Sequence, residues 1–241
     1  ANFFIGVGMA FTHQYRFAAA ESVDKEKIPK AISIILLGGI VSAFIGPGTA
    51  NLTKNFLSEQ LYVGSYVSLA VYMFLPAIFF LFYKNSTIEK KDISFIGRGY
   101  FEIISQPRFL QAMVASAFGY AIMTFLMTAT PISMHVMENM SLNITSFVIQ
   151  MHVASMFLPS LITGNLIKKF GHSKIMYVGL LLYSVTILLS LLDQTFLNYL
   201  VALIFLGFGW NFLFISGTSL LVTTYKEHEK FKAQGLNDFV V

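Results

Sequence analysis

Long apolar runs, separated by short polar segments, set the pattern of this chain. Each run has about the 20 residues that a helix needs to cross the hydrocarbon core of a bilayer. Seven runs therefore predict seven spanning helices, at residues 1–20, 31–50, 61–83, 109–130, 144–167, 175–192 and about 196–224. Residues 239–241 are apolar again and predict the start of a further helix. The pattern predicts an all-α membrane protein, and we expect the sequence to be a piece of a longer one.

Basic residues test this helix count. If the seven helices alternate in direction, all Lys and Arg residues except Lys54 fall in, or at the edge of, the loops on one side. The positive-inside rule makes that side cytoplasmic.

A long basic connection at residues 84–108 separates three predicted helices from four. We interpret residues 1–83 as the end of an N-terminal bundle and 84–108 as a central cytoplasmic linker. Residues 109–241 then form most of a C-terminal bundle, with the start of its fifth helix. The alternative is that 84–108 is simply a large loop.

Composition agrees with membrane insertion and excludes several other functions. Hydrophobic residues make up 56% of the chain and charged residues 12%, about half the share of a soluble domain. The net charge of +4 lies in short loops between apolar runs, which argues against a nucleic-acid partner. The chain has no cysteine, so disulfides and thiol chemistry are excluded. We find no phosphate-binding, metal or nucleophile–base motif, and we expect neither a cofactor nor an enzyme.

Two helices six positions apart carry a similar pattern. Both Gly6–Phe11 and Gly207–Phe212 read Gly-x-Gly-x-x-Phe, and each helix exits through a Lys-Glu turn ending in Lys-Ala, with one residue of slippage. Helices six apart cross the membrane in the same direction. A parallel repeat with this period is the arrangement of the two halves of major facilitator transporters. Chance similarity between two glycine-rich apolar helices is the alternative.

Several segments resemble the major facilitator superfamily. The stretch 164–174 is similar to the family's loop signature Gly-x-Leu-x-Asp-Arg-x-Gly-Arg-Arg/Lys, here in the looser form used between the eighth and ninth helices. Lys168 stands where the family has an acidic residue, which weakens any gating salt bridge there. Gly46 and Pro47 resemble the Gly-Pro motif of the family's fifth helix. The loop motif residues are Gly164, Lys168, Lys169 and Gly171.

Residues 14–21 and 207–212 are similar to one bacterial branch of the superfamily, whose members are mostly uncharacterised permeases. The resemblance implies a bundle of twelve helices, of which this chain holds the fourth to the tenth. It also implies a multi-pass protein of the plasma (inner) membrane that is a monomer when full length.

Small residues recur every four positions in the second predicted helix, at Gly38, Ser42, Gly46 and Ala50. This spacing puts them on one stripe, where another backbone can approach closely. Together with Pro47, the stripe predicts a hinge or a sliding surface. Static tight packing is the alternative.

Of all Lys and Arg residues in the sequence, only Arg16 lies within a predicted span, and His13 is on the same turn. A charge in the hydrocarbon is costly and normally faces a cavity or a partner, so Arg16 is a candidate for binding an anionic or carboxylate-bearing substrate. The alternatives are snorkelling to the membrane edge and pairing with Glu21.

Polar side chains in three other helices are further candidates. Ser116, Tyr120, Thr124 and Thr128 lie four apart and predict a wet cavity wall, unless the hydroxyls bond their own helix. His152 is either a proton relay or a packing residue. Trp210 and Asn211 offer a stacking surface and an amide for a polar ligand, with packing between helices as the alternative. The substrate-binding candidates are thus Arg16, His13, Tyr120, Thr124, Thr128, Trp210 and Asn211.

The function that these observations favour is secondary active transport of a small solute by alternating access. The expected partners are a small-molecule substrate and the lipid bilayer, and a coupling proton or ion stays open. Uptake and drug efflux both stay open. The alternative is a seven-helix receptor or sensor; a retinal protein is disfavoured, because residues 196–224 contain no lysine for a Schiff base.

The topology can be tested with single cysteines, because the chain has none of its own. Cysteines replacing Lys25, Lys90, Lys169 or Lys230 should resist an impermeant thiol reagent in intact cells, while one at Asn139 should react. Labelling at any of the four lysine positions would contradict the predicted topology.

Overall fold

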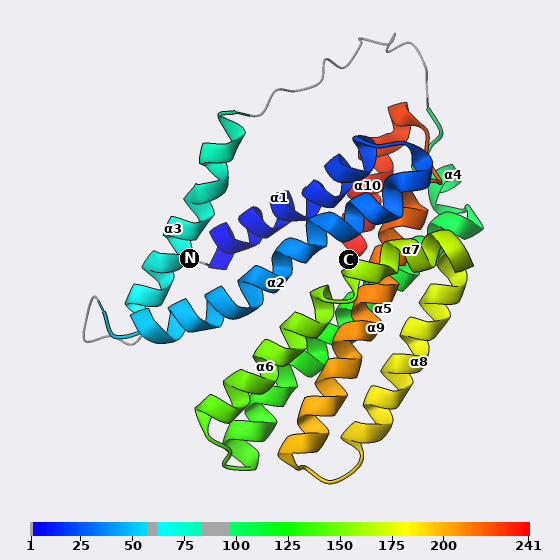
Figure 1. Cartoon of the computed structure of the whole chain (residues 1–241). Coiled ribbons are helices and arrows are strands. Elements are labelled where there is room, and N and C mark those ends of the chain that lie inside the picture. Colours follow the sequence, from blue (N-terminus) through cyan, green and yellow to red (C-terminus); the bar gives the residue numbers. More distant parts are fainter. Residues whose placement is uncertain (1, 57–61, 83–96) are drawn as a thin grey trace. The chain divides into compact units, whose positions relative to one another are not determined.

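The computed structural model describes residues 2–56, 62–82 and 97–241, which form helices and no strand (Figure 1). This confirms the prediction of an all-α fold. The elements are α1 (Asn2–Glu21), the 3₁₀ helix η1 (Lys25–Lys27), α2 (Ile28–Thr53), α3 (Val63–Phe80), α4 (Tyr100–Ile104), α5 (Pro107–Ile132), the π-helical turn η2 (Ser133–Met137), α6 (Leu142–Phe157), α7 (Ser160–Phe170), α8 (His172–Ser190), α9 (Phe196–Val222), the 3₁₀ helix η3 (Glu227–Glu229) and α10 (Lys230–Val240).

Five segments of the described residues are long and apolar enough to span a membrane, fewer than the seven predicted. They are Lys25–Ala50, Pro107–Met137, Leu142–Phe170, His172–Ser190 and Phe196–Val222. The first predicted helix is present as α1, but Thr12, His13, Gln14 and Arg16 make its second half polar. The third predicted helix is present as α3, whose apolar segment Val63–Pro76 is shorter than a full span.

The fifth predicted helix is confirmed as one span, Leu142–Phe170, within which α6 and α7 are separated at Leu158 and Pro159. One predicted boundary was wrong. The helix predicted to begin at Phe239 begins at Lys230 instead. The hydropathy pattern missed this start because the buried face of the helix contains the polar residues Gln234 and Asn237. Apolar counting cannot detect a helix whose inward face is polar.

The chain divides into two compact units, and the division cuts through α1 and α2. One unit comprises residues 1–12 and 44–96, and the other comprises 13–43 and 97–241. In the first, α2 is joined to α3 by a hydrogen bond of 2.8 Å between the hydroxyls of Thr49 and Tyr72. The predicted two-bundle division stays a prediction, and residues 84–96 of its linker lie outside the described residues.

Helix α9 lies among α5, α6 and α8 in the second unit (Figure 1), and its residues from Gly209 to Leu221 are all buried. At Gly207, α9 makes a close contact with α6. A Cβ added at Gly207 would lie 2.8 Å from the backbone nitrogen of Met156 and 2.9 Å from the carbonyl oxygen of His152. The two backbones therefore touch, as small residues allow in membrane helices.

The other sides of α9 pack just as closely. A Cβ at Gly209 would lie 3.0 Å from the carbonyl oxygen of Gly179 in α8, and one at Gly217 would lie 2.8 Å from that of Ala112 in α5. Three glycines thus bring the backbone of α9 against three neighbouring helices.

The order of helix, 3₁₀ turn and helix occurs twice. α1 is followed by the three-residue η1 and then directly by α2, and α9 is followed by the three-residue η3 and then directly by α10. These are the two segments whose sequences carry the shared glycine pattern. The local structure therefore repeats together with the sequence.

Replacement of Gly207 by alanine should destabilise the folded protein. The added methyl group meets backbone atoms that cannot move aside, and overpacking of this kind costs about 1–3 kcal/mol. Thermal unfolding of the full-length protein in detergent measures the effect. The matched control is Gly38→Ala in α2, where an added Cβ meets nothing within 4 Å among the described residues. Equal melting temperatures for the two variants would contradict the packing argument.

Candidate functional site

A buried ion pair joins α1 to α10. Arg16 is 2% exposed, and its Nη2 lies 2.5 Å from Oδ1 of Asp238. The guanidinium carbon lies 4.7 Å from the ring centre of Phe17 and 4.5 Å from that of Phe214, within range of cation–π attraction. The arginine is therefore neither snorkelling nor paired with Glu21, because it has a carboxylate partner deep in the second unit.

Asp238 is the site residue that the sequence analysis missed. It also accepts hydrogen bonds from Gln14 Nε2 at 2.5 Å and from Asn237 Nδ2 at 3.0 Å. The sequence placed Asp238 in a loop before a new helix. The available signal was the spacing of Gln234, Asn237 and Asp238, which puts polar side chains on one helical face.

Aromatic rings form a cluster beside this ion pair. The rings of Trp210 and Phe214 are stacked, with centres 4.7 Å apart, and Tyr120 meets both edge-on at 5.8 and 5.6 Å. Phe157 meets the other side of Trp210 at 5.8 Å. Nε2 of His13 lies 3.3 Å from the Tyr120 hydroxyl. We call these five residues the aromatic cluster.

Three hydrogen-bond donors of this region have no partner among the described residues. They are Nε and Nη1 of Arg16 and Nε1 of Trp210, all buried. Each can donate a hydrogen bond and none can accept one. Burying an unsatisfied donor is costly, so the arrangement favours a ligand that presents acceptor atoms beside an aromatic face.

Four predicted site residues thus come together: Arg16, His13, Tyr120 and Trp210. The threonines of α5 do not join them. Thr128 donates a hydrogen bond of 2.8 Å to the carbonyl oxygen of Thr124, and both side chains are exposed. Thr128 therefore bonds its own helix, which was the alternative reading of the hydroxyl stripe.

Asn211 is held by protein partners on another face of α9. Its Nδ2 donates to the carbonyl oxygen of Met156 at 2.6 Å and to the Ser160 hydroxyl at 2.7 Å. Its Oδ1 accepts a hydrogen bond of 2.7 Å from Thr163. These contacts join α9 to α6 and α7, so we leave Asn211 out of the candidate site.

His152 also contacts α9. Its Nδ1 lies 2.8 Å from the carbonyl oxygen of Leu203, so that nitrogen carries the proton. Its Nε2 is buried and has no hydrogen-bond partner in the described parts of the chain. The contact with Leu203 is the packing role that was the alternative, and the proton-relay role stays a prediction.

The small-residue stripe of α2 crosses from one unit into the other. Gly38 and Ser42 belong to the second unit, and Gly46, Pro47 and Ala50 belong to the first. Ser42 donates a hydrogen bond to the carbonyl oxygen of its own helix at Gly39, and Pro47 lies inside the helix. The predicted hinge stays a prediction.

The loop motif joins α7 and α8 beside the start of α2. A Cβ at Gly164 would lie 2.8 Å from Cα of Lys30, so α7 touches the first turn of α2. Gly171 has φ +84° at the joint of α7 and α8, a conformation that favours glycine. Lys168 lies 3.6 Å from Glu26, while Lys169 lies over the ring of its neighbour Phe170.

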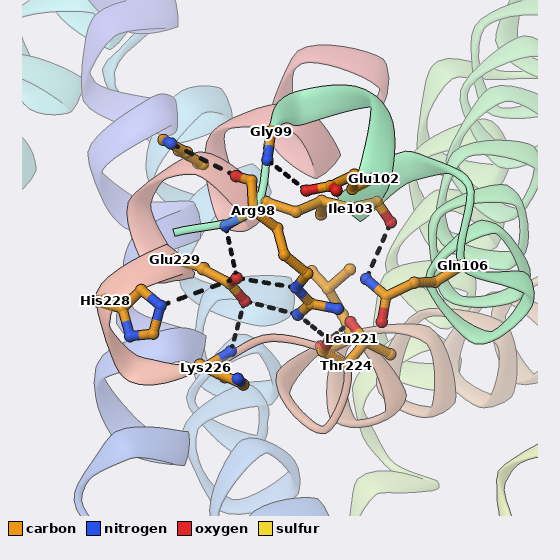
Figure 2. A network of polar contacts seen from close by, with 11 residues as sticks. Arg98, Gly99, Glu102, Ile103, Gln106, Leu221, Thr224, Lys226, His228 and Glu229 are labelled. Atoms are coloured by element: carbon orange, nitrogen blue, oxygen red, sulfur yellow. Dashed lines mark hydrogen bonds and ion pairs between the residues drawn. The ribbon is translucent and has the colours of Figure 1, made fainter. Parts of the chain in front are cut away.

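A second ion pair lies outside the membrane-spanning segments (Figure 2). Glu229, 1% exposed in its side chain, accepts a hydrogen bond at each carboxylate oxygen from Arg98, from Nε at 2.8 Å and from Nη2 at 2.6 Å. The backbone nitrogens of Arg98 and Lys226 also donate to it, at 3.1 and 3.0 Å. Arg98 further donates to the carbonyl oxygen of Thr224.

The Arg98 guanidinium holds the pKa of the Glu229 carboxyl well below its usual range. Burial acts in the opposite direction, and the backbone donors at Lys226 and Arg98 add to the lowering. Because both oxygens are fully bonded, this pair is a structural clamp between the segment before α4 and the turn before α10.

Comparison with known proteins gives a family for the whole chain. Residues 1–241 match the model of the Major Facilitator Superfamily. The chain is 37% identical to the riboflavin transporter RfnT of Brucella anthropi over 238 residues, which is 98% of this chain and 60% of that protein. It is 27% and 25% identical to the uncharacterized MFS-type transporters YddS and YdeG of Bacillus subtilis, over 98% of this chain and 58% of each. The chain thus spans about three fifths of the length of these curated relatives.

Glu229→Gln should destabilise the protein by about 2 kcal/mol at pH 7, because it removes the charged acceptor of several hydrogen bonds. A lowered pKa means that the carboxylate stabilises the fold above the ordinary glutamate pKa of about 4.3 and loses this contribution as pH falls below it. Thermal unfolding of both proteins at a series of pH values should therefore show a difference that shrinks below about pH 4. The control is Glu26→Gln, at an exposed ion pair that contributes little. A pH-independent difference would contradict the assignment.

Proposed function

Because this chain belongs to the major facilitator superfamily, we propose that it forms most of a secondary transporter for a planar heteroaromatic solute of the riboflavin type. One observation carries the choice of solute: buried donors that have no partner in the described part of the chain lie beside a stacked aromatic pair. The likeness to a riboflavin transporter of Brucella anthropi supports the same choice.

The chemistry of the cluster matches that of a flavin ring. The isoalloxazine system of riboflavin is flat and apolar on its faces and carries carbonyl oxygens and ring nitrogens at its edge. Trp210 and Phe214 are 2% and 3% exposed here, so the face of such a ring would pack on them in a conformation of the transport cycle that uncovers them, with the offset or edge-on geometry that aromatic pairs prefer. Its edge acceptors can take hydrogen bonds from Arg16 Nε and Nη1 and from Trp210 Nε1, the donors without partners.

Charge balance also favours an uncharged solute. From the sequence alone we expected Arg16 to bind an anionic substrate, but Asp238 already neutralises the arginine. An anion would have to displace that carboxylate or bind beside it, at a cost in desolvation and repulsion. A neutral solute with acceptor atoms needs only the N–H groups of the two guanidinium nitrogens that have no partner among the described residues, Nε and Nη1.

Transport would follow the alternating access expected for this family, in the plasma (inner) membrane. Contacts between α1 and α10 would then have to break and reform, because these helices belong to the two predicted bundles. Besides the Arg16 pair, Glu21 at the end of α1 accepts hydrogen bonds from Lys230 at 2.9 Å and from Gln234 at 2.8 Å. The coupling ion stays open. The receptor alternative is not favoured, because the named relatives are transporters.

The proposal is tested by riboflavin uptake into cells that depend on the full-length protein. Trp210→Ala should lower uptake about tenfold or more at equal protein abundance in the membrane, a loss of ~1.4 kcal/mol or more in binding. Lumiflavin, which keeps the isoalloxazine ring and carries a methyl group in place of the ribityl chain, should compete with riboflavin.

The matched control is Phe125→Ala, which removes an aromatic ring of α5 that is 73% exposed. Uptake should then stay near the wild-type rate. Normal riboflavin uptake by Trp210→Ala, or no competition by lumiflavin, would overturn the proposed substrate class and leave the family membership untouched.

A further inference from the structure

A groove lies on the second unit between α5 and α8, away from the aromatic cluster. Its volume is about 370 Å³, and Leu213 of α9 belongs to its lining. The α5 side carries Val114 and Phe118, and the α8 side carries Tyr177 and Leu180. All four side chains are exposed: Val114 and Leu180 at 46% each, Phe118 at 60% and Tyr177 at 69%. The groove is thus an open apolar channel on the surface of the unit.

One end of the groove is polar. Gln111 and Ser173, near the first turns of α5 and α8, line it there and are joined by a hydrogen bond of 2.8 Å. Arg108 reaches over this end, where its Nη1 donates to Gln111 Oε1 at 2.9 Å and to the Ser173 hydroxyl at 3.1 Å. Both partners are neutral, so these contacts position the guanidinium without compensating its charge.

A second cation, Lys174, is the chain neighbour of Ser173 at this end of the groove. Lys174 lies three residues before Tyr177, which places it on the helical face that Tyr177 shares. Both cations are exposed. The groove therefore combines an apolar channel with a doubly basic end, on the side where the basic loops predict the cytoplasm.

We propose that this groove binds an anionic phospholipid of the cytoplasmic leaflet. Its phosphate lies at Arg108 and Lys174, and one acyl chain runs along Val114, Phe118 and Leu180. From Val114 to Ile122 the wall of α5 is about 12 Å long at 1.5 Å per residue, enough for a large part of an acyl chain. Basic residues at the cytoplasmic ends of membrane helices attract anionic head groups.

Selectivity comes from the head group in this arrangement. The acyl chain is surrounded by apolar groups in the bilayer and in the groove alike, so its transfer contributes little. The two cations instead favour a lipid with a net negative charge over a zwitterionic one. The inference rests on the groove and its charges, and it does not depend on riboflavin being the substrate.

Native mass spectrometry of the purified full-length protein, titrated with phosphatidylglycerol or phosphatidylethanolamine, tests the proposal. The wild-type protein should retain phosphatidylglycerol about tenfold more strongly, and the double variant Arg108→Gln, Lys174→Gln should lose this preference. The control double variant Lys25→Gln, Lys169→Gln removes two exposed cations of the same predicted side and should keep it.

A second variant tests the channel with both cations in place. Val114→Trp fills the groove at an exposed position and should lower phosphatidylglycerol binding about tenfold as well. An unchanged lipid preference in the Arg108 and Lys174 double variant would overturn the proposal. So would an equal loss in the control, because binding would then follow total charge, and so would normal binding by Val114→Trp.

Discussion

Close backbone contact along α9 is the constraint on which the second unit depends. Apolar side chains gain little from association inside a lipid bilayer, so helices there are held by close packing and hydrogen bonds. Gly207, Gly209 and Gly217 bring α9 against α6, α8 and α5, and Asn211 fixes its rotation with three hydrogen bonds. Trp210 and Phe214, four residues apart on the same helix, stack on one another.

α10 is held in a different way, by charge and hydrogen bonds. Glu229 binds Arg98 just before its first turn, Lys230 and Gln234 bind Glu21 along it, and Asp238 binds Arg16 near its end. Its buried face includes Ala233, Gln234 and Asn237 and offers little apolar surface. The position of α10 therefore depends on ionic contacts, and these contacts also decide which donors of Arg16 stay available to a solute.

The hydrophobic pattern predicted most of the helices but could not settle the site. Arg16, His13, Tyr120 and Trp210 were identified because polar or amphipathic groups stand out in apolar helices, and the structure brings them together. Asn211 and Thr128 looked equivalent in sequence, yet their hydrogen bonds go to protein carbonyls and hydroxyls. Whether a membrane hydroxyl or amide faces a cavity or a neighbouring backbone depends on helix rotation, which residue types do not determine. Asp238 was missed because a polar inward face cannot be told from a loop by hydropathy.

The clamp at Glu229 also sets an order of events during synthesis. Arg98 precedes its partner by 131 residues. At a translation rate of about 5–20 residues per second, Glu229 is therefore synthesised roughly 7–26 s after Arg98. During that interval α5, α6, α7 and α8 have all left the ribosome, while α9, against which they pack, comes only near its end. Glu229 follows closely after α9, so the helix that packs among α5, α6 and α8 and the carboxylate that pairs with Arg98 leave the ribosome one after the other.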